Sequence, residues 1–311
     1  MTRVAAYDCG TNSLRLLVAD LDPEKGKARE LVREMRIVRL GEGVDKTGRI
    51  GDAAMARVLA AVDDFAAMAA RHDVEATVFA ATSAARDAEN AAVFTAAVEA
   101  RVGVAPTVLT GEQEARLSFT GAVRTLRGAA PAPHLVVDIG GGSTEFILGT
   151  DEVEQAQSLD IGSVRITERH LHSDPPTREE IQAAIADIDA ALDTLTVDIA
   201  RAASVIGVAG TVTTIAAGAL RLASYQRELI HHSVIDKASA QATVNALLTM
   251  GTQQRLALGY LHPGRADVIG GGGLVLDRLL RRTPVYAMLV SEQDILDGLA
   301  WSTLETPHRE N

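Results

Sequence analysis

The segment from Asp138 to Thr144, with the sequence DIGGGST, contains the residues whose types and spacing most clearly indicate chemistry. It follows the apolar run at 134–137, so we expect a buried strand that ends at Asp138. Three successive glycines, Gly140, Gly141 and Gly142, let backbone N–H groups converge without obstruction by Cβ atoms, and such a concave turn suits phosphate oxygens. Ser143 and Thr144 can add hydroxyl donors. The alternative is an ordinary glycine-rich hairpin.

Two carboxylates flank this turn. Asp138, at the end of the expected strand, can hold a divalent cation directly or through water, since magnesium prefers carboxylate and water oxygens together with substrate phosphates. Glu145 begins the next strand and faces the same side only if the two strands fold into a hairpin. The alternative for either residue is a surface acid.

The chain opens with a second copy of this pattern. Asp8-Cys9-Gly10 with Ser13 has the same spacing as Asp138-Ile139-Gly140 with Ser143. Alone, DCGTNS is typical of a turn with a capping Asp. Two copies indicate two related α/β halves, each with a strand, an Asp and a glycine turn, so Asp8, Asn12 and Ser13 become candidates for the same chemistry.

A third candidate turn is at Gly210 and Thr211, after the apolar run at 205–209. Gly210 lets a phosphate approach the backbone, and Thr211 can cap a helix whose N-terminus carries a partial positive charge. Ordinary helix capping explains the same residues equally well.

Alternating strand and helix patterns must position these turns. In the first half we expect strands at 3–8 and 14–21, helices at 52–72 and 90–102, a strand at 76–86, and a strand and turn that lead into a helix near Glu112. The second half predicts a capped helix at 177–203, a strand, turn and helix at 204–220, a helix at 273–280 and a strand at 284–291. This alternation predicts an open α/β sheet in each half.

The Pro- and Ala-rich connector at 128–133 is the best candidate boundary. It predicts an N-terminal domain at 1–127 and a C-terminal domain at 128–292, with a final helix at about 293–311 that packs back on the first domain. The run at 202–220 has no charge, but its glycines and threonines favour a buried strand and helix over a membrane span.

Composition excludes several classes of protein. The 311 residues carry a net charge of −11 with no long Lys/Arg block, so we expect no binding to nucleic acid or membranes. The single cysteine, Cys9, excludes an intrachain disulfide and a multi-cysteine metal site. The N-terminus has no apolar signal core, so the expected location is cytoplasmic.

The strings YDCGTNS, ATSAAR, TGEQEA, DIGGGSTE and AGT, in this order, resemble the exopolyphosphatase/guanosine pentaphosphatase (Ppx/GppA) phosphohydrolases of the actin, Hsp70 and sugar-kinase superfamily. The resemblance implies two ribonuclease-H-like (actin-like ATPase) domains with the active site in an interdomain cleft. It also makes a homodimer plausible.

The resemblance assigns roles residue by residue. The catalytic base maps to Glu114 in GEQEA; the preceding position departs from the family pattern because it is Gln113, and Glu112 is a nearby competitor. Arg86, which ends ATSAAR, maps to a phosphate-contacting arginine. The implied metal ligands are Asp8, Asp138 and Glu145. The implied phosphate-binding residues are Asn12, Ser13, Arg86, Gly140, Gly141, Gly142, Ser143, Thr144, Gly210 and Thr211.

The expected activity is therefore hydrolysis of the terminal phosphate of inorganic polyphosphate, with shorter chains favoured, by water and Mg²⁺ or another divalent cation. Guanosine pentaphosphate is the alternative substrate. Two other classes stay open: a small-molecule kinase of the same superfamily, with Gly270 to Gly273 under an adenine, and a nucleotide-binding scaffold without catalysis. The family's C-terminal LREG-like string is Ile295-Leu296-Asp297-Gly298 here, without its Arg.

Overall fold

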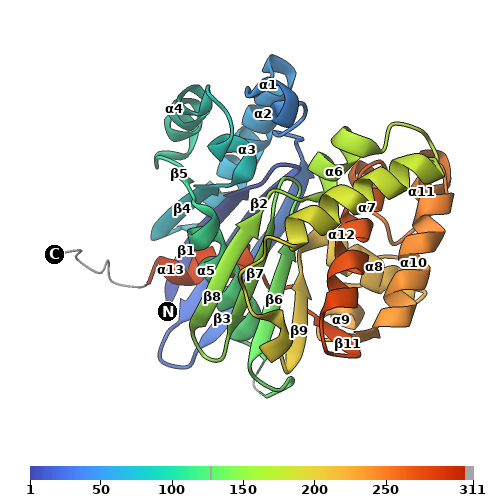
Figure 1. Cartoon of the computed structure of the whole chain (residues 1–311). Helices are drawn as coiled ribbons and strands as arrows, with labels where there is room; N and C mark the ends of the chain where they lie inside the picture. Colours follow the sequence, from blue (N-terminus) through green and yellow to red (C-terminus); the bar gives the residue numbers. More distant parts are fainter. Residues whose placement is uncertain (127, 305–311) are drawn as a thin grey trace. The chain divides into compact units, whose positions relative to one another are not determined.

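A computed structural model of the chain describes residues 1–126 and 128–304 (Figure 1). Backbone contacts divide it into two compact units. Unit 1 comprises Met1–Gly121 and the described part of Ile295–Asn311, and unit 2 comprises Ala122–Asp294. The expected end of the final helix, beyond residue 304, and the expected boundary at residue 127 lie outside the described residues.

Unit 1 is built on a five-stranded sheet with the order β3-β2-β1-β4-β5. Its strands are β1 (Thr2–Cys9), β2 (Ser13–Asp22), β3 (Lys27–Ile37), β4 (Ala76–Ala81) and β5 (Thr107–Val108). The first three are antiparallel neighbours, whereas β4 runs parallel to both β1 and β5. The sheet is therefore mixed, with its parallel part at β1, β4 and β5.

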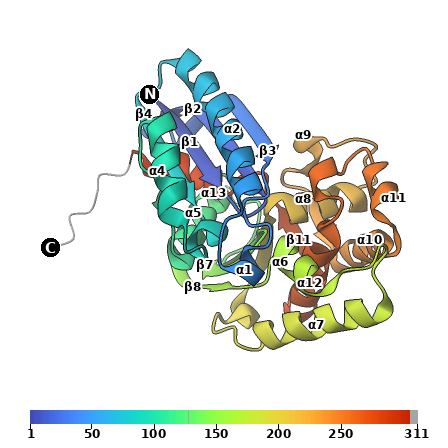
Figure 2. The same ribbon diagram turned by 90° about the horizontal axis from the view of Figure 1, so that it is seen from above.

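Side-chain alternation along β1 gives unit 1 two apolar faces. Ala5, Tyr7 and Cys9 pack in the cluster that contains α2 and α4, whereas Val4 and Ala6 pack in the cluster that contains α13. Figure 2 shows α2 and α4 beside each other in this unit. The helices are α1 (Val44–Thr47), α2 (Asp52–Ala69), α3 (Ser83–Arg86), α4 (Ala91–Val102), α5 (Gly111–Val123) and α13 (Ile295–Ser302), with a 3₁₀ turn at Ala70–His72.

Unit 2 repeats the plan with six strands in the order β10-β11-β9-β6-β7-β8. The strands are β6 (His134–Ile139), β7 (Thr144–Gly149), β8 (Val153–Leu159), β9 (Ser204–Val208), β10 (Val234–Asp236) and β11 (Ala287–Val290). The helices are α6 (Ser163–His170), α7 (Arg178–Leu192), α8 (Ala209–Ala219), α9 (Arg227–Ile230), α10 (Lys237–Thr249), α11 (Thr252–Leu256) and α12 (Ile269–Arg282). Leu135, Val137 and Ile139 of β6 pack with α7, α8, α10 and α12 in one apolar core.

The predicted α/β class with two ribonuclease-H-like domains is confirmed, as are both glycine hairpins, because β1 pairs with β2 and β6 with β7 in antiparallel register. Three boundaries were wrong. The helix expected to run to residue 203 ends at Leu192, and the strand expected at 76–86 ends at Ala81, where α3 follows. The helix expected from Gly273 begins at Ile269, so it includes all four glycines.

These glycines allow helices to approach closely. A Cβ on Gly271 would lie 2.6 Å from Thr167 Oγ1, and one on Gly272 would lie 2.6 Å from Thr211 Oγ1. The close approach of α12 to α6 and α8 therefore outweighs the low helix propensity of glycine. The uncharged run at 202–220 forms β9 and α8, and no described helix combines the length and the apolar character needed to cross a bilayer.

Candidate active site

The candidate residues of unit 1 gather at the carboxyl ends of three neighbouring parallel strands. Cys9 of β1 pairs with Ala81 of β4, which in turn pairs with Val108 of β5. The turn at 10–12, the segment from Thr82 to Arg86 and the start of α5 directly follow these positions. This edge of a parallel sheet is where α/β proteins bind ligands.

Glu114 and Arg86 meet at this edge. Arg86 Nη1 donates to the Leu109 carbonyl at 2.8 Å and to Glu114 Oε2 at 3.2 Å. Glu114 is buried in the first turn of α5, whereas Glu112 is exposed and pairs with Arg116 at 2.9 Å. The sequence offered Glu114 and Glu112 as candidates for the catalytic base, and of these two residues only Glu114 contacts Arg86.

Gln113, the departure from the family pattern, has a structural role. Its Oε1 accepts from the Thr110 N–H at 2.9 Å, and its own N–H donates to Thr110 Oγ1 at 3.2 Å. These two bonds form a capping box at the start of α5, in which Gln and Glu are equivalent. Gln113 therefore fixes the helix start from which Glu114 projects.

The turn of the first hairpin is held from one side. Gly10 N–H donates to the Ser13 carbonyl at 2.9 Å, the Thr11 carbonyl accepts from Gly41 N–H, and the Asn12 carbonyl accepts from the N–H groups of residues 38 and 39. Since a trans peptide directs C=O and N–H oppositely, the N–H groups of Asn12 and Ser13 point away from the segment 38–41.

The second hairpin has the same closing bond, from Gly140 N–H to the Ser143 carbonyl at 3.0 Å. All three glycine carbonyls of the turn are directed at α6. Gly140 O accepts from Ser163 N–H at 2.9 Å, Gly141 O accepts from Val164 N–H at 2.8 Å, and Gly142 O accepts from Arg165 Nε at 2.7 Å. The N–H groups of Gly141, Gly142 and Ser143 therefore point away from α6, as an anion-binding nest requires.

Arg165 was not among the site residues predicted from the sequence. It is 9% exposed and lies in the first turn of α6, directly behind the glycine turn. Gly162 makes this close fit possible, since a Cβ there would lie 2.4 Å from Gly141 O and 2.7 Å from the Gly142 carbonyl carbon. The turn is thus held by a tightly packed helix start and by one buried guanidinium.

Asp138 and Glu145 face each other across the second hairpin. They are direct cross-strand partners, so their side chains share one face of the sheet. Both are buried: Asp138 is 6% exposed and Glu145 is 1% exposed. The Ser158 hydroxyl donates to Glu145 Oε1 at 2.7 Å. Two carboxylates with an adjacent hydroxyl form an all-oxygen set that fits Mg²⁺.

Asp8 has a different surrounding from Asp138. Its cross-strand partner is Arg15, which donates to Asp8 Oδ2 from Nε at 2.9 Å and from Nη2 at 2.5 Å. Arg15 occupies the hairpin position that Glu145 occupies in unit 2. No described group of three or more His, Cys, Asp or Glu side chains is placed to hold a metal ion, so a metal role for Asp8 stays a prediction.

Cys9, next to Asp8, is completely buried. Burial and the neighbouring Asp8 carboxylate raise the pKa of its thiol, because both disfavour the thiolate. A protonated thiol is a poor nucleophile. Cys9 therefore serves as a small core residue.

Gly210 lies at the same edge of its sheet as the glycine turn of unit 2, because Val208 of β9 pairs with Asp138 of β6. A Cβ on Gly210 would lie 1.9 Å from Arg265 Cζ, so the guanidinium rests on this glycine. Arg265 was also missed; its signal is the Pro-Gly turn in HPGRAD. The Thr211 side chain is buried against Gly272 of α12, so the structure does not turn it towards the edge.

The chain is similar to several known proteins over most of its length. Exopolyphosphatase 2 of Mycobacterium tuberculosis is 47% identical, with 97% of this chain and 98% of that protein aligned. The crystal structure of an exopolyphosphatase-like protein superposes with a TM-score of 0.93 at 42% identity and 97% coverage of both chains. Guanosine-5'-triphosphate,3'-diphosphate pyrophosphatase of Vibrio atlanticus is 29% identical over 99% of this chain and 60% of its own length. The model of the Ppx/GppA phosphatase family matches residues 17–306, and the chain belongs to this family.

Proposed function

We propose that this protein is an exopolyphosphatase that releases terminal orthophosphate from inorganic polyphosphate by attack of water. The observation that carries the proposal is the pair of Glu114 and Arg86, which places a buried carboxylate beside a guanidinium at the carboxyl ends of β4 and β5. The outward N–H groups of the DIGGGST turn and the 47% identical relative support it.

Each group of residues has its own role in the proposed reaction. The N–H groups of Gly141, Gly142 and Ser143 bind phosphate oxygens, and Arg86 neutralises charge through its planar fork of donors. Glu114 accepts a proton from the attacking water. The water oxygen then bonds to the terminal phosphorus as its bond to the bridging oxygen breaks, so one orthophosphate leaves and the chain becomes one phosphate shorter.

Magnesium is the proposed cofactor, held by Asp138 and Glu145. When bound, it would neutralise charge on the phosphate oxygens. Asp138 and Glu145 belong to unit 2, and the proposed base, Glu114, belongs to unit 1.

Guanosine pentaphosphate is the second candidate substrate because a relative named for a guanosine phosphate, that of Vibrio atlanticus, aligns over nearly all of this chain. The kinase alternative has less support. The glycines that could have underlain an adenine, Gly270 to Gly273, lie inside α12 and pack against side chains of neighbouring helices. A cytoplasmic location and a homodimer stay predictions from the sequence; light scattering of the purified protein tests the dimer.

The direct test is phosphate release. The purified protein is incubated with Mg²⁺ and either polyphosphate or guanosine pentaphosphate at equal concentrations of chain ends, and orthophosphate is measured over time. We expect faster release from polyphosphate. A higher kcat/KM for guanosine pentaphosphate would reverse the order of the two substrates, and no release from either with any divalent cation would refute the proposed function.

Glu114→Gln tests the assigned base. The amide keeps the shape and a hydrogen-bond acceptor but cannot take the proton, so we expect kcat to fall by roughly 10²–10⁴-fold with little change in KM. Glu112→Gln is the matched control, because Glu112 is exposed on the same helical turn and should leave kcat unchanged. If Glu112→Gln loses activity and Glu114→Gln does not, the assignment of the base is wrong.

A further inference from the structure

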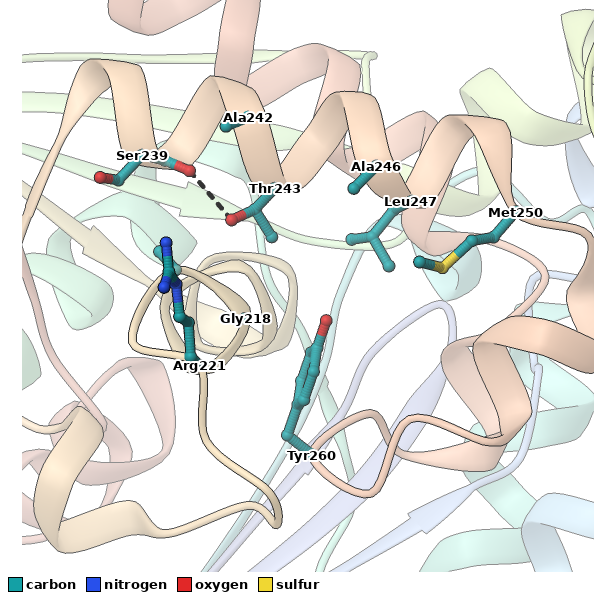
Figure 3. A pocket seen from close by; sticks show the side chains of 10 residues that line it. Gly218, Arg221, Ser239, Ala242, Thr243, Ala246, Leu247, Met250 and Tyr260 are labelled. Atoms are coloured by element: carbon teal, nitrogen blue, oxygen red, sulfur yellow. Dashed lines mark hydrogen bonds between the residues drawn. The ribbon is translucent and has the colours of Figure 1, made fainter.

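A cavity of about 260 Å³ lies in unit 2 between the C-terminal end of α8 and one face of α10 (Figure 3). Tyr260, in the loop after α11, closes it from a third side. Gly218 makes room for this tyrosine, since a Cβ there would lie 2.9 Å from the Tyr260 hydroxyl and 2.7 Å from Thr243 Cγ2. The cavity is thus formed by close packing around a glycine.

The cavity has one cationic end. Arg221 is exposed at the rim and lines it, and among the described residues its guanidinium has no hydrogen-bonding or ionic partner. No Asp or Glu belongs to the lining. A guanidinium that faces such a cavity without a counter-charge favours an anionic group, above all a planar carboxylate that can accept two parallel hydrogen bonds.

The middle of the cavity offers one uncommitted hydroxyl. Thr243 Oγ1 donates to the Ser239 carbonyl at 2.9 Å, and Ser239 Oγ donates to Asp236. The half-buried Tyr260 hydroxyl, which points towards α10 in Figure 3, has no partner among the described residues. It can therefore donate a hydrogen bond to a ligand or accept one from it.

The other end is apolar. Leu247 and Met250 line it together with alanines of α10, and in Figure 3 they lie on the far side of Tyr260 from Arg221. Methionine adapts its shape to apolar groups and makes favourable contacts with aromatic rings. The volume of about 260 Å³ suits a small organic molecule.

This cavity is separate from the glycine turn at the start of α8. Gly218 and Gly210 are eight residues apart in one helix, and a rise of 1.5 Å per residue separates them by about 12 Å along its axis. We propose that the cavity is a binding site for a small organic carboxylate with an aromatic or short aliphatic body, distinct from the proposed site of phosphate hydrolysis.

The experiment uses the whole protein and one matched pair of probes, 4-phenylbutyrate and its neutral analogue 4-phenyl-1-butanol, with binding measured by calorimetry and ligand-observed NMR. We expect saturable binding of the acid with a Kd of about 0.1–1 mM. We expect the alcohol to bind about tenfold more weakly, because it has no charge to pair with Arg221.

Two variants and a control locate the site. Arg221→Met removes the charge and Ala246→Phe fills the cavity; each should weaken binding of the acid about tenfold or more. Ala238→Phe adds the same ring to an exposed position of α10 outside the lining and should bind as the wild type does. Absence of saturable binding to the wild type, equal binding of acid and alcohol, or unchanged binding in both cavity variants would overturn the proposal. Phosphate release without the probe should be the same in all three variants.

Discussion

Gly162→Ala is the sharpest test of the glycine turn as a preorganised phosphate site. Gly162 has φ −137° and ψ 169°, an extended conformation that alanine adopts without strain, so the substitution acts through space alone. The added Cβ would lie 2.4 Å from Gly141 O, 2.5 Å from the Gly141 carbonyl carbon and 2.7 Å from the Gly142 carbonyl carbon. These neighbours are backbone atoms, so no side chain can rotate away.

The geometry sets the expected magnitude. An ordinary contact begins at about 3.4 Å, so the distance of 2.4 Å to Gly141 O must grow by about 1 Å through movement of the turn, of α6 or of both. A misplacement of about 1 Å can cost on the order of 10²-fold in rate, or about 2.7 kcal/mol of transition-state stabilisation. Overpacking of this kind also costs about 1–3 kcal/mol of folding free energy.

Steady-state phosphate release from polyphosphate measures kcat/KM, and circular dichroism with thermal melting reports the fold. Gly51→Ala is the matched control: Gly51 is also extended, at φ −72° and ψ 153°, and its Cβ would meet nothing within 4 Å. It should keep full activity and lower the melting temperature only slightly, because Gly51 is the N-cap of α2, where alanine is less favourable than glycine. A folded Gly162→Ala protein with wild-type kcat/KM would show that the position of this turn does not govern phosphate hydrolysis.

Three further predictions follow from other contacts. Arg165→Met leaves the Gly142 carbonyl without its guanidinium donor. We therefore expect the free energy of unfolding to fall by about 1–3 kcal/mol and the KM for polyphosphate to rise. Arg165→Lys should partly restore the KM. Glu145→Gln removes one proposed magnesium ligand and should raise the Mg²⁺ concentration for half-maximal rate by about tenfold or more, whereas an unchanged Mg²⁺ titration would exclude Glu145 as a ligand. Hydrogen bonds from Arg3 and Arg29 lower the pKa of Asp20 to about 2 from its ordinary 3.8. Asp20 therefore stabilises the fold above a pH of about 4 and loses this contribution as the pH falls towards about 2, so Asp20→Asn should flatten acid unfolding in that range when followed by circular dichroism.

Much of the site could be predicted because its local signals agree. A buried strand, an Asp, a glycine turn and a hydroxyl recur with one spacing, and both copies form hairpins with the same closing hydrogen bond, from Gly10 to Ser13 and from Gly140 to Ser143. The pairing of Glu114 with Arg86 could not be read from spacing, since 28 residues separate them. It depends on β4 and β5 lying side by side, which is a property of the sheet.

The missed features have physical reasons. The strand β3 has the sequence KARELVREMRI, whose charged residues resemble an exposed helix, and pairing with β2 decides its conformation instead. The apolar pattern after Leu192 continues without glycine or proline, so nothing in the sequence marks the end of α7. Glycines at 270–273 predict a turn by propensity, but the close approach of α6 and α8 selects a helix there. Arg165 has no motif, and the Pro-Gly turn before Arg265 does not predict its contact, because both arginines act on backbone far away in the sequence.

The two hairpins show how one backbone arrangement can carry different chemistry. In unit 1 the cross-strand pair is Asp8 with Arg15, an ion pair formed through Asp8 Oδ2. In unit 2 the pair at the same position is Asp138 with Glu145, two carboxyl groups on one buried face of the sheet. Two neighbouring carboxylates offer oxygen ligands to a divalent cation, so we propose magnesium at the second hairpin, and a metal role for Asp8 stays a prediction. The duplicated sequence pattern thus predicts the duplicated hairpin, and the residue opposite each Asp gives the two copies different chemistry.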